Sequence, residues 1–309
     1  MKAIVLRLSA FCLFAALPAA PAFAAISYDQ STVPLEADSS DSSLAKVVLL
    51  AGSQANKAGQ HEYFAGCALL KQWLQQTPGV WPVMVRNGWP TNESIFKGAR
   101  TVVIYVEGGG KQPFFEPSRW AILKQLMDAG AGLVMVHQAV DFPGGPDREV
   151  KEWLGGVWTR DIGCRGHWDM ELKPLAEHPV LRGVGAFPVK GDGWLYNLHF
   201  ADARVTPLLA GPVPASSRTT PDAKKHAGRD EVMAWAFERG NGGRSVGFTG
   251  CDLHKNWALP EQRRLMLNSI LWTAKLPVPA GGAPANFSPL DLEKHLDDKR
   301  TNAPASVKR

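Results

Sequence analysis

Four short runs of apolar residues constrain the fold of this chain more than any other feature. They read KVVLLAG, WPVMVR, RTVVIYV and GLVMVH and begin at residues 46, 81, 100 and 132. Apolar residues at helical spacing fill 61–76 between the first two runs and 118–129 between the last two. Strands that are apolar on both faces and joined by helices are typical of parallel sheets covered on both sides. We therefore predict a doubly wound α/β domain with a mostly parallel sheet.

The second half of the chain is less regular. Beyond about residue 155, aromatic-rich loops surround short strands such as WDMEL and RVTPLL, before VMAWAFER, GRSVGFT and a helix from Pro260 to Lys275 restore the pattern. After Pro277 the chain is rich in Pro, Gly and Ala, with one short amphipathic piece, SPLDLEKHLDD. We divide the chain into a signal peptide (1–24), a flexible leader (25–45), one domain (46–279) and a C-terminal tail (280–309).

The N-terminus has the pattern of an export signal. Lys2 and Arg7 precede the apolar run Leu8 to Leu17, and Ala22-Phe23-Ala24 has the small-x-small pattern of a signal peptidase site. We expect cleavage after Ala24 and a periplasmic or secreted protein. No later segment approaches the roughly 20 apolar residues that span a bilayer, so no membrane association is expected after cleavage. Cleavage also lowers the formal charge from +5 to +3, too little to indicate nucleic acid as a partner.

The cysteines predict neither a disulfide scaffold nor a lipid anchor. Cys12 follows Phe11, where a lipoprotein signal needs a small residue. The mature chain keeps Cys67, Cys164 and Cys251, which are far apart, so at most one disulfide is expected and no CxxC motif exists.

Polar residues follow several of the predicted strands, where the loops of a parallel sheet bind ligands. His61 and Glu62 begin the first helix after a Gly-rich loop, and His137 directly follows the fourth apolar run. Structural alternatives stay open, since Glu62 suits the helix dipole and a histidine after a strand often only completes a hydrogen-bond network. We expect Glu62 and His137 to be catalytic, as acid or base.

The stretch KGDGWLYNLHF places Trp194 and Tyr196 beside Asp192 and Asn197. Aromatic faces next to polar groups bind sugars, although the same alternation fits a half-buried edge strand. We expect these four residues, together with Trp257, to bind substrate.

The stretch GFTGCDLHKNW follows the last predicted strand and ends in polar residues. We expect His254 to be catalytic and to face the pocket with Trp257, while Asp252 is a ligand or acid–base candidate. The alternative is a loop before a helix, in which Asp252 is a cap and Trp257 fills the core.

Three histidines, His61, His137 and His254, would suit one divalent ion, zinc or a similar one, if they met above one edge of the sheet. No HExxH or HxH spacing enforces such a site. The sequence therefore leaves the cofactor open.

Taken in order, these motifs resemble the ThuA-like (trehalose utilisation) domain family over roughly residues 46–279. The residues that carry the resemblance are VVLLAG, GQHEY, NGWP, YVEGGG, GLVMVHQAV, WLGGVW, EHPVLRGV, DGWLYNLHF and ERGNGGRSVGFTG. The resemblance implies a class I glutamine amidotransferase-like fold of flavodoxin-like topology. It also implies a link to bacterial catabolism of trehalose, related disaccharides or their 3-keto derivatives, without a firmly assigned reaction.

Glutamine amidotransferase activity is not expected, despite the fold that the resemblance implies. That activity needs a cysteine nucleophile on a tight turn after a central strand, and His137 occupies this position here. Cys67 lies in a helical pattern, and no His-x-Glu pair follows Cys251.

Three stretches depart from the pattern of the family. Asp192-Gly193-Trp194 stands where relatives tend to have Asp-Glu before an aromatic residue, and Gly250-Cys251-Asp252 where they often have Gly-Gly-His. Ser53-Gln54-Ala55-Asn56 stands where a Ser-His pair is common. These differences remove candidate ligands or acid–base groups.

The sequence thus predicts an exported protein that acts on a small carbohydrate, as an isomerase, lyase or hydrolase of a sugar or keto-sugar. The alternative is a non-catalytic sugar-binding or accessory protein that uses the same pocket. The oligomeric state stays open.

Overall fold

The strand order of one large sheet determines where the functional residues lie. The computed structural model describes residues 26–144 and 147–300, so the predicted signal peptide and its cleavage site lie outside the described residues. Its strands are β1 (Ala45–Ala51), β2 (Val80–Val85), β3 (Ala99–Tyr105), β4 (Gly132–Val136), β5 (Gly156–Val157), β6 (Cys164–Pro174), β7 (Phe187–Tyr196), β8 (His199–Phe200), β9 (Val205–Gly211), β10 (Glu231–Glu238) and β11 (Arg244–Phe248). Its α-helices are α1 (Tyr63–Leu74), α2 (Pro117–Asp128), α3 (Asp147–Leu154), α4 (Pro221–Lys225) and α5 (Pro260–Thr273).

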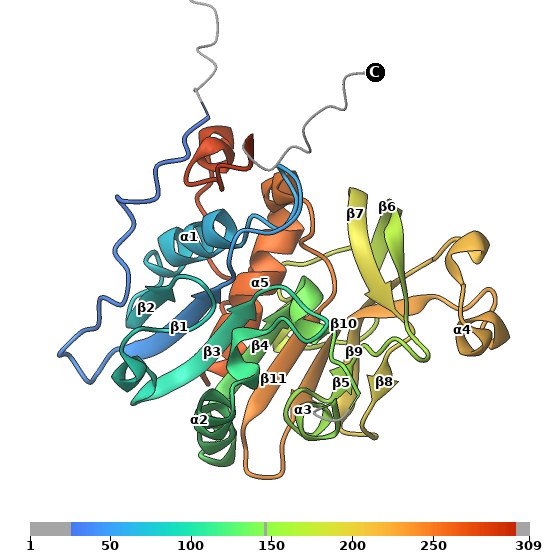
Figure 1. The fold of residues 1–309 in the computed structure, drawn as a ribbon, viewed down its shortest axis with the longest axis horizontal. Helices are drawn as coiled ribbons and strands as arrows, with labels where there is room; N and C mark the ends of the chain where they lie inside the picture. The colour runs from blue at the N-terminus through green and yellow to red at the C-terminus, as the bar shows by residue number, and fades with distance from the viewer. Residues whose placement is uncertain (1–25, 145–146, 301–309) are drawn as a thin grey trace, which may run out of the picture.

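The sheet has a parallel half and an antiparallel half. Its nine strands run in the order β2-β1-β3-β4-β11-β10-β9-β6-β7 (Figure 1). The first five are mutually parallel and have the 2-1-3-4-5 order of flavodoxin-like folds, with β11 as the fifth strand. The other four are antiparallel to their neighbours and extend the sheet on the β11 side. The predicted flavodoxin-like α/β fold is confirmed.

Alternate residues of the parallel strands pack against helices on opposite faces. Val48, Val102 and Leu133 contribute to a core with side chains of α2 and α3. Their chain neighbours Val47, Val103 and Val134 contribute to a second core, with side chains of α1 and α5. Both faces are therefore buried, which explains why these strands appear in the sequence as continuous apolar runs.

The segments before and after the predicted domain pack against it. Leu35 forms a bridge with Met84 of β2, and Trp73 of α1 donates a hydrogen bond to the carbonyl of Asn286. The two segments also contact each other, because Ser27 N–H donates to the carbonyl of Glu293. Both the leader and the tail thus contribute ordered contacts within residues 26–300, while the domain boundaries stay predictions.

Cys67, Cys164 and Cys251 are each buried and free, so they form no disulfide with one another.

Among the described residues, no helix combines the length and the apolar character that crossing a membrane requires.

Close packing between β10 and β11 leaves no room for a side chain at Gly247. Gly247 is paired with Trp235, whose indole N–H donates to the carbonyl of Leu154 at 2.9 Å. A Cβ atom on Gly247 would lie 2.1 Å from Cζ2 of this indole. The glycine is therefore required by the position of the tryptophan on the neighbouring strand.

We expect Gly247→Ala to lower the free energy of unfolding by about 1–3 kcal/mol, because the indole must leave its position. Urea denaturation measures this change. Gly240→Ala is the control, since its Cβ would meet open space, and a slight gain in stability of up to about 1 kcal/mol is expected. Equal stability of the two variants would contradict the packing argument.

Candidate metal centre and active site

The carboxyl ends of the parallel strands carry a group of polar side chains. His61 follows the loop after β1, Glu107 follows β3, His137 follows β4, and Asp252 follows β11. Because these strands are neighbours and parallel, their carboxyl ends meet at one edge of the sheet, where ligands bind in such folds.

Left-handed backbone conformations turn the chain at three of these strand ends. His61 has φ 48°, His137 has φ 55° and Cys251 has φ 76°, values that residues other than glycine rarely adopt. Such strain is concentrated at functional sites and persists only where the surrounding contacts enforce it. His137 thus stands on a sharp turn directly after β4.

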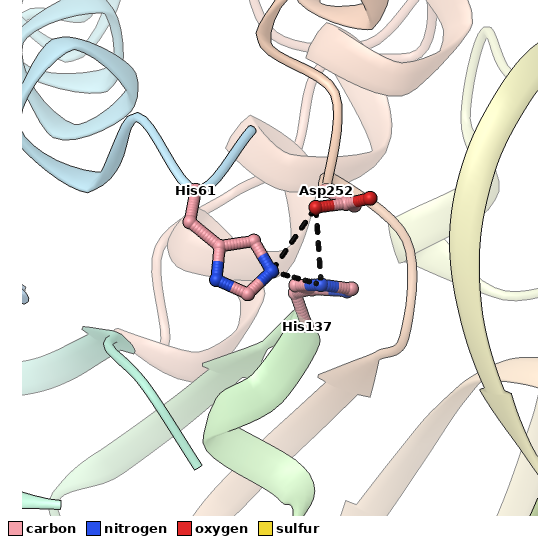
Figure 2. Close-up of side chains that lie close together, drawn as sticks. All are labelled: His61, His137 and Asp252. Atoms are coloured by element: carbon pink, nitrogen blue, oxygen red, sulfur yellow. Dashed lines mark hydrogen bonds and ion pairs between the residues drawn. The ribbon is translucent and has the colours of Figure 1, made fainter. Parts of the chain in front are cut away.

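Three donor atoms converge at the centre of the site (Figure 2). Nε2 of His61 lies 3.1 Å from Nε2 of His137 and 3.0 Å from Oδ1 of Asp252. Nε2 of His137 lies 3.7 Å from the same carboxylate oxygen. The side chains are buried, and one donor atom from each lies within 4.8 Å of the others.

Hydrogen bonds to the opposite ring nitrogens fix the tautomer of each histidine. Nδ1–H of His137 donates to the carbonyl of Thr249 at 2.8 Å, which leaves the lone pair on Nε2. Nδ1 of His61 lies 3.0 Å from Oε2 of Glu107, which also accepts a hydrogen bond from Tyr63 O–H, and it contacts the side-chain nitrogen of Asn56. With Nδ1–H donating to the carboxylate of Glu107, Nε2 of neutral His61 keeps its lone pair. In its neutral form, each imidazole therefore directs an unprotonated nitrogen towards Asp252.

The carboxylate of Asp252 is held on one side and open on the other. Its Oδ2 accepts a hydrogen bond from Nε2 of His167 at 2.6 Å. Its Oδ1, which faces the two histidines, is buried and accepts no hydrogen bond of suitable geometry from the described residues. An unpaired buried carboxylate oxygen beside two imidazole lone pairs is the donor set that zinc or a similar divalent ion prefers. The three residues thus fit a metal ion, with Glu107 and Thr249 orienting the ligands from behind.

Asp192 supports the loop that presents Asp252. Its buried carboxylate accepts hydrogen bonds from the backbone N–H groups of Cys251 at 3.0 Å and Leu253 at 2.8 Å. Burial raises the pKa of Asp192 to about 6, against the opposing effect of these bonds. Asp192, predicted to bind substrate, therefore positions the loop on either side of Asp252.

The protonation states of the three residues determine how readily they bind a cation. Burial and, after it, the charge on His61 lower the pKa of His137 to about 4, so His137 is neutral at physiological pH. Burial raises the pKa of Asp252, but the adjacent histidines outweigh it and hold this pKa at about 2. Burial likewise lowers the pKa of His61, yet the carboxylates of Asp252 and Glu107 raise it above its ordinary value. His61 is therefore the ligand at which a proton competes most strongly with a cation.

A cavity of about 380 Å³ opens onto this cluster. The two histidines, Asp252 and Glu107 line it together with Arg165 and His167 of β6. Cavities of roughly 300–1,000 Å³ are typical of small-molecule sites. The cavity therefore gives a small polar molecule access to the three donor atoms.

Six of the predicted functional residues do not line this cavity, among them Glu62, His254 and Trp257. Glu62 is buried and turned towards the C-terminal segment, where it pairs with Lys299 at 3.1 Å. His254 is buried near Leu292 and Lys299, so the predicted set of three histidines does not form and Asp252 takes the third place. Trp257 is fully buried in the core against Trp73, as the structural alternative for this residue predicted.

Of the predicted substrate-binding residues in β7 and just after it, only Trp194 lines the cavity. Its ring is almost entirely buried, however, and its indole N–H donates to the carbonyl of Trp168 at 3.1 Å. Tyr196 forms a hydrogen bond with Ser217, and Asn197 donates to the carbonyl of Ile162, both away from the cavity. The structure thus places these aromatic residues in an edge hairpin rather than in an exposed sugar-binding face.

Sequence reasoning missed Glu107, Arg165 and His167 as site residues. Glu107 follows the third apolar run, so the rule that selected His137 could also have found it. Arg165 and His167 come from an antiparallel strand, and nothing in the local pattern indicates that β6 borders the cavity.

Comparisons with known proteins identify the fold. A ThuA-like protein from Bacteroides uniformis superposes with a TM-score of 0.56 at 15% identity and covers 78% of this chain and 95% of its own. A ThuA-like protein from Parabacteroides merdae gives a TM-score of 0.54 at 14% identity and covers 81% of this chain and 99% of its own. The chain has the fold of the ThuA-like proteins. No family model and no curated protein sequence matches it.

We expect the purified protein to bind Zn²⁺, and His61→Ala, His137→Ala and Asp252→Ala each to weaken binding more than about 100-fold. Loss of a residue that orients a ligand lowers metal affinity roughly 10–100-fold, and loss of a ligand itself should lower it more. Competition with a chromophoric chelator measures the affinity.

His254→Gln is the control for this experiment, because its ring lies outside the cluster. It should bind Zn²⁺ like the unmodified protein, with folding checked by circular dichroism. Loss of Zn²⁺ in His254→Gln together with retention in His61→Ala would contradict the assigned ligands.

Proposed function

We propose that this protein is a metal-dependent enzyme that acts on a small sugar or keto-sugar. The observation that carries the proposal is the convergence of His61, His137 and Asp252 in the lining of one cavity. Once His61 has lost its proton, two imidazoles and a carboxylate leave coordination positions for a substrate oxygen, as in catalytic rather than structural metal sites. The link to carbohydrates rests on the resemblance to the ThuA-like family.

A keto-sugar suits this arrangement because the C–H bonds beside its carbonyl are acidic. A bound divalent ion supplies a Lewis acid that polarises the carbonyl and stabilises negative charge on its oxygen. The protein must then provide a base for the proton and groups that orient the sugar hydroxyls.

Glu107 is our candidate for this base. Its side chain is a quarter exposed in the cavity, and within the described residues its hydrogen bonds from His61 and Tyr63 both use Oε2. Burial raises the pKa of Glu107, but the hydrogen bond from His61 and the charge on that ring outweigh it, so the carboxylate is ionised at neutral pH. Oε1 therefore remains able to take a proton from the carbon beside the carbonyl.

Arg165 and His167 are suited to bind the rest of the substrate. They are alternate residues of β6, so their side chains lie on the same face of the strand, and both line the cavity. The guanidinium of Arg165 contacts Asp141 through Nη1 at 3.3 Å, and its side chain is nearly half exposed. Donors of Arg165 and the remaining ring nitrogen of His167 can thus reach hydroxyl groups of a bound sugar.

With the metal ion at saturating concentration, we expect Glu107→Gln to lower turnover of a 3-keto-disaccharide about 10²–10⁴-fold, the range of a general base, while substrate affinity is retained. The measurement is NMR of a panel of 3-keto-disaccharides incubated with the protein and Zn²⁺, Mn²⁺ or Mg²⁺. Glu238→Gln, at an exposed carboxylate outside the cavity, is the matched control. Sugar binding without turnover under every condition would favour the non-catalytic alternative.

We also propose that the protein acts outside the cytoplasm, supported by the signal-peptide pattern of residues 1–24. Expressed in a Gram-negative host, the mature chain should begin at Ala25. Mass spectrometry of the periplasmic fraction tests this, and recovery of uncleaved chain from the cytoplasm alone would contradict it.

A further inference from the structure

The loop that carries His61 is covered by a C-terminal segment, which we call the strap (residues 294–300). Lys299 of the strap is buried, and its Nζ lies 3.1 Å from Oε1 of Glu62. The same ammonium donates to the backbone carbonyls of Lys57, Gln60 and His61. One lysine thus contacts three carbonyl groups of a single loop and the carboxylate that follows it.

This arrangement depends on the positive charge of Lys299. Three carbonyl oxygens and a carboxylate directed at one point repel one another unless a cation lies among them. Lysine is almost never fully buried unless it is paired, and here the pairing is with the loop itself. The ammonium therefore stabilises the loop conformation in which these carbonyls converge.

Glu62 ties the strap to the loop a second time. Its Oε2 accepts a hydrogen bond from the backbone N–H of Asp297 at 2.9 Å, and its Oε1 accepts one from Gly59 N–H at 2.9 Å. Glu62 therefore connects the strap backbone with the turn that precedes His61.

The opposite side of the loop contacts the segment that presents Asp252. His61 N–H donates to the carbonyl of Asp252 at 3.0 Å, and His254 N–H donates to the carbonyl of Gly59 at 2.9 Å. The loop is thus held between the two segments, and His61 keeps its left-handed conformation under contacts from both sides.

We propose that Lys299 and Glu62 are positioning residues that hold His61 in its metal-binding conformation, so that docking of the strap sets the metal affinity of the site. The proposal rests on the proposed function, because it requires His61 to be a ligand. Neither residue touches the three donor atoms, so their effect on the metal must pass through the backbone of the loop.

The test is Zn²⁺ affinity and the Co²⁺ absorption spectrum of the full chain. Lys299→Met leaves Glu62 buried without its partner, so the double variant Lys299→Met/Glu62→Gln is measured as well, which removes both charges. We expect each to weaken Zn²⁺ binding about 10–100-fold, as changes to outer-shell partners do. The Co²⁺ spectrum should shift towards that of His61→Ala.

The matched control is a buried ion pair away from the cavity. Arg218 and Glu231 pair at 2.6 Å and are almost fully buried. Arg218→Met/Glu231→Gln also removes two buried charges, yet it should keep the Zn²⁺ affinity and the Co²⁺ spectrum of the unmodified protein. A general loss of stability would instead affect both double variants alike.

The outcomes separate this inference from the proposed function. If the unmodified protein binds Zn²⁺ and the folded Lys299→Met/Glu62→Gln variant binds it equally well, with an unchanged Co²⁺ spectrum, the role of the strap is overturned alone. If the unmodified protein binds neither ion, the proposed function is overturned and this inference with it.

Discussion

The mutual repulsion of three electron-rich atoms, once His61 has lost its proton, is the constraint on which the site depends. Nε2 of His61, Nε2 of His137 and Oδ1 of Asp252 lie 3.0–3.7 Å apart in a buried environment. In water, such groups would turn away from one another, so each must be held in place by contacts behind it. Thr249, Glu107 and His167 provide these contacts through the remaining nitrogen or oxygen of each ligand. The contacts of the folded chain thus hold these three atoms close together, and a bound cation would remove their mutual repulsion.

The sequence predicts the frame of this arrangement and two of its three donor atoms. Continuous apolar runs specify the parallel strands, and the carboxyl-end rule then selects His61 and His137 without any knowledge of side-chain positions. The places of these residues can be predicted because they depend on periodicity and strand direction, which are local properties of the chain.

The third donor could not be assigned in the same way. Asp252 and His254 are two residues apart, and the left-handed conformation of Cys251 directs the loop so that the aspartate enters the cluster and the histidine faces the C-terminal segment. A non-glycine residue with positive φ has no reliable signal in a single sequence. Glu62 was misplaced for a related reason, because its partner Lys299 lies 237 positions away and nothing near Glu62 indicates it. Long-range contacts decide which of several neighbouring polar residues face the cavity.

The contact between Lys299 and the carbonyl of His61 joins positions 238 residues apart. In a chain made from its N-terminus, His61 therefore precedes the residue that contacts it by nearly the whole of the sheet, and contacts between residues so far apart in the sequence form slowly. The site would consequently bind a metal ion only late in folding, when the C-terminal segment has packed against the loop. An incompletely folded chain, with its histidines still exposed to passing metals, would lack the geometry to retain one.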